Sequence, residues 1–172
     1  MAAWLLAVNV ALAQLPQDVA IPAENAASLK QAPPRPPVGD AQDNAKLLFD
    51  AIVHDEPARA MGFFFPREAF LQVKAMAKPE RYYERLRKRF EQDIHTLHRD
   101  TPDLDRASFE RLELVRRGGW VKVGEEGNRL PYWASRHSWL HYRVGEAKRK
   151  IELRVLITWG QRWYVIHLNE FR

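Results

Sequence analysis

The stretch that decides the fold runs from Arg136 to Leu168 and reads RHSWLHYRVGEAKRKIELRVLITWGQRWYVIHL. Apolar and polar residues alternate along it, and this period of two is typical of β-strands. Two pairs interrupt the alternation, Gly145-Glu146 and Gly160-Gln161, and a leading Gly suits a two-residue type II′ turn. The pattern predicts three antiparallel strands in a meander, over residues 130–144, 150–159 and 163–171.

Two-residue turns also predict which side chains share a face of the sheet. The first turn places Arg136 opposite Val155, and the second places Val155 opposite Ile166. Both turns agree on one apolar inner face, which consists of Ile151, Leu153, Val155, Ile157, Trp159, Tyr164, Ile166 and Leu168. A three-residue first loop would instead turn the first strand over.

Upstream of the strands the apolar period is helical. A first helix begins after Asp40, which is a suitable N-cap, and Pro57 breaks it. A short helix is expected over 58–65, whereas 67–77 fits either a short helix or an edge strand. A long helix is expected over 79–99, and its apolar stripe contains Tyr82, Leu86, Phe90, Ile94 and Leu97.

Residues 109–117 and 120–123 alternate as strands and flank the glycines Gly118 and Gly119, which predicts a hairpin. Together with the meander, this hairpin gives a sheet of about five strands. The expected class is therefore α+β, with N-terminal helices packed on an antiparallel sheet.

Residues 1–13 have the pattern of a signal peptide, with an apolar run that ends in Ala11-Leu12-Ala13. No Lys or Arg precedes the run, so an upstream start, an uncleaved anchor and a buried apolar N-terminus stay open. Residues 14–39 hold six of the eleven prolines and predict a linker. The domain then covers 40–172, and we expect export to the periplasm or the extracellular space.

Bulk composition limits the partners. The net charge is +5 and the isoelectric point is about 9.6, which favours anionic partners. The absence of cysteine excludes disulfides, thiol catalysis and cysteine-based zinc sites. We expect no cofactor and a small apolar or anionic ligand or an envelope protein as partner. A membrane surface and a homodimer stay open, whereas export makes nucleic acid an unexpected partner.

The order of elements resembles that of the nuclear-transport-factor-2-like superfamily. The resemblance rests on a first helix ending in His54-Asp55-Glu56, on Pro57–Phe65, on the long helix and on a sheet that closes with Trp163–His167. It implies a cone in which a curved sheet wraps the long helix. Such folds host dehydratases, isomerases, hydrolases, transport adaptors and ligand-free modules, so the resemblance implies a fold and not an activity.

Asp93 interrupts the apolar stripe of the long helix, where a carboxylate is costly unless it is paired. Arg136 and Ser138 interrupt the inner sheet face, which Tyr142 and Tyr164 share, and we expect Ser138 and Tyr164 to contribute to ligand binding there. We expect Asp93, Arg136 and Tyr142 to line a pocket in which Asp93 is a general base and Arg136 or Tyr142 stabilises an oxyanion. The alternative is a structural ion pair, or an Asp93 that reaches water at a rim.

The opposite sheet face predicts a second candidate, a basic surface that binds an anionic lipid or glycan. Its residues are His137, Trp139, His141 and Arg143, with Lys148, Lys150 and Arg154 opposite them. The alternative is a solvated face whose charges protect the sheet. We expect no metal site, because the four histidines His95, His98, His137 and His141 lack a third ligand at suitable spacing. The residues 125–128 are interpreted as an ordinary loop.

The sequence thus favours an exported, non-enzymatic binding or accessory domain of the cell envelope. One alternative is a small-molecule lyase or isomerase with a pocket between the long helix and the sheet. The other is an adaptor that binds anionic surfaces through the outer sheet face.

Overall fold

The computed structural model describes residues 19–169 and confirms the α+β class. The helices are α1 (Ala41–His54), the 3-10 helix η2 (Pro57–Phe63), α2 (Arg67–Val73) and α3 (Pro79–Asp100). The strands are β1 (Ala107–Glu113), β2 (Gly118–Val121), β3 (Tyr132–Val144), β4 (Ala147–Trp159) and β5 (Arg162–His167). No helix within 19–169 is long and apolar enough to cross a membrane.

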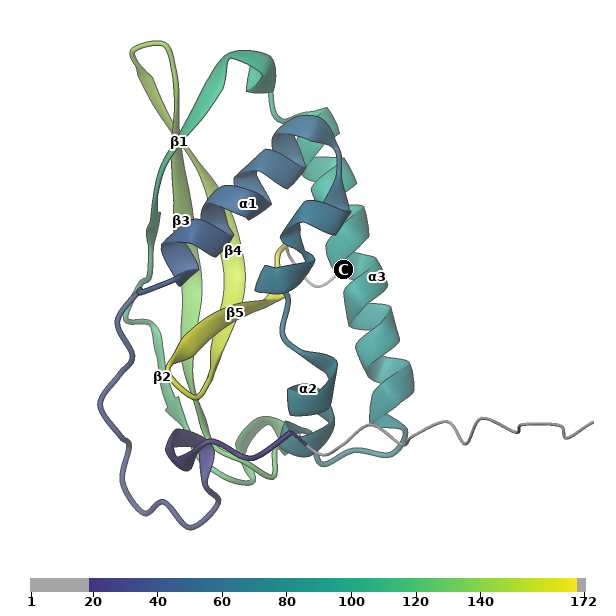
Figure 1. Ribbon diagram of the computed structural model, residues 1–172, viewed down its shortest axis with the longest axis vertical. Coiled ribbons are helices and arrows are strands. Elements are labelled where there is room, and N and C mark those ends of the chain that lie inside the picture. Colours follow the sequence, from purple (N-terminus) through teal and green to yellow (C-terminus); the bar gives the residue numbers. More distant parts are fainter. Residues whose placement is uncertain (1–18, 170–172) are drawn as a thin grey trace, which may run out of the picture.

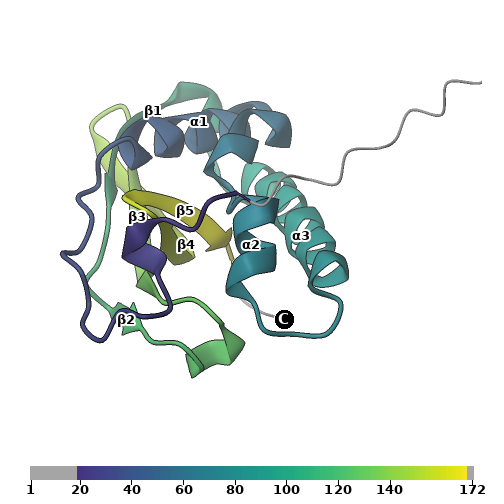
Figure 2. The same cartoon turned by 60° about the horizontal axis from the view of Figure 1, so that its bottom comes forward.

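The five strands form one antiparallel sheet in the order β1-β3-β4-β5, with β2 also paired to β3. Figure 1 shows the sheet on one side of the molecule and α3 on the other, and β5 runs from the sheet toward α3. In Figure 2, α1 crosses above the sheet while α2 and α3 lie side by side. The helices therefore cover one face of the sheet.

The predicted hairpin across Gly118 and Gly119 is wrong, although both of its strands exist. β1 pairs with β3 from Trp139 to Val144, and β2 pairs with β3 from Tyr132 to Ser135. The two short strands therefore follow one another along the same edge of the longer β3. Gly118 has φ +121°, and its backbone lies so close to Ala134 that an added Cβ would stand 2.9 Å from the carbonyl oxygen of Ala134.

The register of the meander is confirmed for β3 and β4, because Arg136 pairs with Val155. Between β4 and β5 the predicted register holds as far as Val165, which pairs with Leu156, and fails after it. Val155 then faces His167 and not Ile166, because Ile166 is the extra residue of a β-bulge. The bulge places His167 opposite Val155, the position that an unbroken alternation would have given to Ile166.

The core lies between the inner sheet face and the helices. The buried side chains of α3 are Tyr83, Leu86, Phe90, Asp93 and Ile94. The predicted stripe is thus confirmed in its centre, including the anomalous Asp93, whereas Tyr82 is only partly buried. Aromatic contacts join the layers, for example between Phe65 and Trp159 at 6.5 Å and between Phe64 and Phe90 at 5.0 Å.

The described part of the predicted linker, residues 19–39, lies against the domain. Figure 1 shows this segment, in purple, along the lower end of the molecule before it rises to α1. The indole N–H groups of Trp133 and Trp163 donate to the carbonyl oxygens of Pro33 and Pro36 at 3.1 and 3.2 Å. The predicted signal peptide lies outside the described residues.

Candidate functional site

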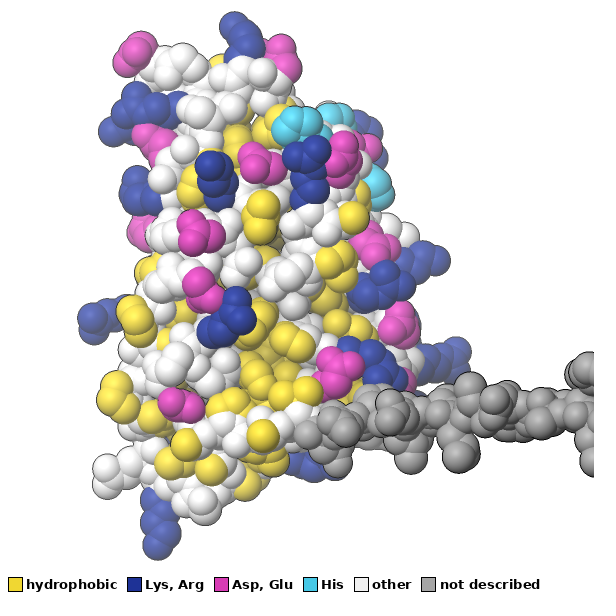
Figure 3. All heavy atoms as spheres, viewed as in Figure 1, with side chains coloured by type: hydrophobic (Ala, Val, Ile, Leu, Met, Phe, Trp, Pro, Cys, Tyr) yellow, Lys and Arg dark blue, Asp and Glu magenta, His cyan; other side chains and the backbone are white. Residues whose placement is uncertain are grey.

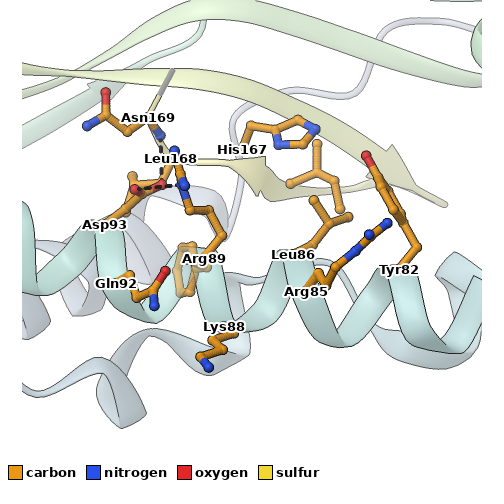
Figure 4. A pocket seen from close by; sticks show the side chains of 12 residues that line it. Tyr82, Arg85, Leu86, Lys88, Arg89, Gln92, Asp93, His167, Leu168 and Asn169 are labelled. Carbon is orange, nitrogen blue, oxygen red and sulfur yellow. Dashed lines mark hydrogen bonds and ion pairs between the residues drawn. The ribbon is translucent and has the colours of Figure 1, made fainter. Parts of the chain in front are cut away.

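Two adjoining cavities lie between α3 and the inner sheet face. The larger has a volume of about 530 Å³ and opens beside the end of β5, whereas the smaller has about 230 Å³ and lies beside α2. Both are lined by the same four side chains, Tyr82, Leu86, Ile166 and His167, which therefore form their common wall. Figure 4 shows Tyr82 and Leu86 reaching up from α3 while His167 projects from the strand opposite.

Asp93 lines the larger cavity and is 7% exposed. Its carboxylate lies 3.5 Å from Nε of Arg89, one helical turn earlier, and accepts a 3.3 Å hydrogen bond from the backbone N–H of Asn169. Burial raises the pKa of Asp93, and the opposing effects of Arg89 and Asn169 do not cancel the rise. The protonated form of Asp93 is thereby favoured relative to an exposed aspartate.

The smaller cavity is built where α2 meets the loop before β3. Lys74 follows the last residue of α2, and its neighbour Ala75 donates its backbone N–H to the carbonyl of Gly127 at 2.9 Å. The backbone N–H of Arg129 donates to the carbonyl of Val73 at 2.7 Å. These bonds hold the loop against α2, and Glu126 within the loop has a positive φ of 53°. Positive φ is costly for a residue with a side chain and is often found at functional sites.

Four side chains meet at this cavity, and we name Lys74, Glu126, Tyr132 and Arg136 the Glu126 cluster. The phenol of Tyr132 donates to Glu126 Oε2 at 2.9 Å, and the guanidinium of Arg136 forms an ion pair with Glu126 Oε1. The ammonium of Lys74 donates to the carbonyl oxygen of Glu126 at 3.2 Å and to the Tyr132 hydroxyl at 3.4 Å. Glu126 thus binds Arg136 and Tyr132 through its carboxylate and Lys74 through its backbone carbonyl.

Burial shifts the protonation equilibria around this cluster. Burial lowers the pKa of Lys74, and burial followed by the charge of Glu126 raises the pKa of Tyr132. His167 lines the same cavity, and burial, with Lys74 and Arg136 adding to it, lowers its pKa to about 4. At neutral pH the His167 imidazole is therefore uncharged and Tyr132 keeps its proton.

The structure does not bring the predicted trio Asp93, Arg136 and Tyr142 together. Asp93 lines the larger cavity, Arg136 lines the smaller one, and each has a different partner of opposite charge. The ring of Tyr142 packs on Phe49 at 5.4 Å. The reason is the length of β3: residues six positions apart on one strand face are about 20 Å apart.

The other two inner-face residues predicted to bind a ligand have structural contacts. Tyr164 packs edge-on against Phe65 at 5.8 Å, and Arg162 lies 5.7 Å from the Tyr164 ring. Ser138 shares a 2.8 Å hydroxyl hydrogen bond with Ser135 and accepts one from the backbone N–H of Val115. Neither Ser138 nor Tyr164 lines either of the two cavities.

Sequence reasoning missed Lys74, Glu126, Tyr132 and His167 as site residues. Lys74 stood in the ambiguous stretch 67–77, and Glu126 stood in what was interpreted as an ordinary loop. The alternation assigned His167 to the outer face, but the bulge in β5 places it at the cavity instead. A signal did exist, because Tyr132 continues the inner-face alternation of Arg136.

The outer sheet face is basic in sequence but mixed in charge. Glu152 pairs with His137 and, at 3.3 Å, with Arg154. Elsewhere on the face Glu113 pairs with His141 at 2.7 Å, Glu110 pairs with Arg143, and Lys150 lies 3.7 Å from the ring centre of Trp139. The cations predicted to bind an anionic surface therefore already have acidic or aromatic neighbours. Figure 3 likewise shows side chains of both charges interspersed over another face of the molecule.

Comparison of the chain with protein-family models, with curated protein sequences and with solved structures gives no significant match. The site is therefore interpreted from its own geometry.

Proposed function

We propose that this protein is a binding domain for a small organic molecule that lies between α3 and the inner sheet face. The observation that carries the proposal is the pair of adjoining cavities, which share a mainly apolar wall and have polar side chains at both ends, the Glu126 cluster in the smaller and Asp93 with Arg89 in the larger. Ligand sites in proteins typically combine apolar walls with a few placed polar groups, in volumes of roughly 300–1,000 Å³. The larger cavity, at about 530 Å³, falls within that range.

The proposal is tested with a neutral bicyclic probe, 2-naphthol, and backbone amide chemical shifts. We expect shift changes that centre on Leu86, Ile166 and His167. Leu86→Phe adds volume to the common wall and should weaken binding at least tenfold, whereas Leu47→Phe on the exposed face of α1 should not. Shift changes away from the common wall, or equal binding by both variants, would contradict the proposal.

A lyase or isomerase that uses Asp93 is the second candidate. The observation that favours it is the buried carboxylate of Asp93, whose pKa is raised by burial, on the wall of the larger cavity. Arg89 and the backbone N–H of Asn169 replace Arg136 and Tyr142 as its neighbours. If Asp93 is the base, Asp93→Asn abolishes turnover of a small carbonyl compound while the protein stays folded. Unchanged turnover would exclude this role.

The fold family and the location of the protein are also proposals. The order α1, η2, α2, α3 and then the sheet supports a nuclear-transport-factor-2-like cone. Export is supported by the sequence of residues 1–13. Expression of the full chain with determination of the mature N-terminus tests it, and a product that starts at Gln14 outside the cytoplasm is expected.

Binding of an anionic surface is the least supported of the three functions, because Glu110, Glu113 and Glu152 pair with the cations of the outer face. Co-sedimentation with anionic vesicles at rising salt tests it.

A further inference from the structure

The smaller cavity contains more positive than negative charge. Lys74 and Arg136 are the cations, Glu126 is the anion, and His167 is uncharged at neutral pH. Arg136 has the carboxylate of Glu126 as its direct partner, which also accepts the Tyr132 phenol. One elementary positive charge, on Lys74, is thus left without a carboxylate at hydrogen-bonding distance among residues 19–169.

The partners of Lys74 are a neutral carbonyl oxygen and a neutral phenol. An ammonium has three N–H donors, so these two acceptors leave capacity for one more. The carboxylate of Glu126 attracts Lys74 only at longer range, and burial is the larger influence on the Lys74 pKa. Lys74 is partly buried, and a cation that is withdrawn from water is stabilised by a paired anion, so the cavity favours a monoanion as its occupant.

The other walls of the cavity are suited to an apolar body. They include the side chains of Phe70, Leu86, Val155, Ile157 and Ile166. An engineered apolar cavity of about 150 Å³ is known to take up benzene. The volume of about 230 Å³ therefore suits a single ring, or a chain of similar size, that carries one acidic group.

From this charge balance and this shape we infer that the smaller cavity binds a small organic carboxylate with an apolar body. The carboxylate accepts a hydrogen bond from Nζ of Lys74, and the body packs between Phe70, Leu86 and Ile157. Glu126 stays bound to Arg136 and Tyr132, so each of its carboxylate oxygens already has a partner. The inference rests on the proposed function and names the class of ligand.

The test uses two probes of nearly equal shape, benzoate and the neutral benzamide, with the full chain at pH 7. Isothermal titration or amide shifts should give binding of benzoate at least tenfold tighter, which corresponds to about 1.4 kcal/mol. Lys74→Met keeps the side-chain length and removes the charge, and it should abolish the preference. Lys46→Met, on an exposed position of α1, should retain it.

Four results would overturn the inference. Equal binding of the two probes would exclude a carboxylate as the ligand, and so would a preference for benzoate that survives in Lys74→Met with an intact fold. Either result would leave the proposed binding function standing if 2-naphthol still binds. Amide shifts from benzoate that avoid Lys74, Tyr132 and His167 place the anion elsewhere. Failure of benzoate, benzamide and 2-naphthol alike would remove the proposed function as well.

Discussion

The indole N–H of Trp163, a fully buried residue of β5, donates a 3.2 Å hydrogen bond to the carbonyl oxygen of Pro36. This bond joins the last strand to a segment 127 residues earlier in the chain. Arg35, next to Pro36, places its guanidinium 5.1 Å from the centre of the Trp163 ring and donates to the carbonyl of Val115. The proline-rich segment is therefore a structural part of the domain over residues 19–39.

Asn25 tests how much this segment contributes to stability. Its side-chain amide is buried, donates to the carbonyl of Pro131 at 2.8 Å and accepts from the backbone N–H of Gly160 at 2.7 Å. Asn25→Ala leaves both partners without their hydrogen bond, and we expect a loss of about 2–3 kcal/mol in the free energy of unfolding. Urea denaturation measures it. Gln31→Ala, exposed in the same segment, is the control and should change stability by less than about 0.5 kcal/mol.

The glycine pair at the start of β2 gives a second prediction with its own control. Gly118→Ala combines a φ of +121° with a Cβ 2.9 Å from a backbone oxygen, so we expect a loss of about 3 kcal/mol or more. Gly119→Ala has a φ of +73° but nothing within 4 Å of the added Cβ, so about 1 kcal/mol is expected. Thermal unfolding compares the two. Equal losses would show that backbone strain alone, and not the contact with Ala134, limits this position.

His167 should make stability depend on pH. Its pKa is about 4 in the folded protein against 6.5 for an unperturbed histidine, so between these values the unfolded chain binds more protons. The contribution is present above pH 6.5 and is lost as the pH falls toward 4, with a total of about 3 kcal/mol. His167→Gln should flatten the pH dependence of the urea midpoint in this window. An identical slope in the variant would contradict a buried neutral imidazole.

Asp93 should act in the opposite direction. Its pKa is raised, so the folded state holds the proton more tightly than the unfolded state, and stability falls as the pH rises above 3.8. Asp93→Asn removes the buried charge and keeps an acceptor for the Asn169 N–H. We expect the variant to be more stable than the wild type at pH 7 and the difference to vanish near pH 3. Lower stability of the variant at pH 7 would mean that the pair with Arg89 outweighs the burial.

The sequence by itself determined the elements whose signals are local. The period of two after residue 130 and the turn at Gly145-Glu146 determined the register between β3 and β4, because a two-residue turn admits one pairing. In the same way, the turn at Gly160-Gln161 determined the register between β4 and β5 as far as Val165. The helical stripe determined that Asp93 would be buried, since a residue's angle around a helix follows from its position in the chain. These features need no knowledge of distant residues.

Only the tertiary structure decided what joins distant parts of the chain. The glycines at 118 and 119 suggested a hairpin and gave no sign that β1 and β2 pair with the same edge of β3. The alternation likewise gave no sign of the bulge that brings His167 to the cavity. Nor did Glu126 carry a local signal, because its partner Lys74 directly follows α2, 52 residues before it, and its partner Arg136 lies in β3, ten residues after it. Cavities and buried ion pairs arise from packing between elements, whereas the periodicity of the sequence predicts only which face of each helix or strand is buried.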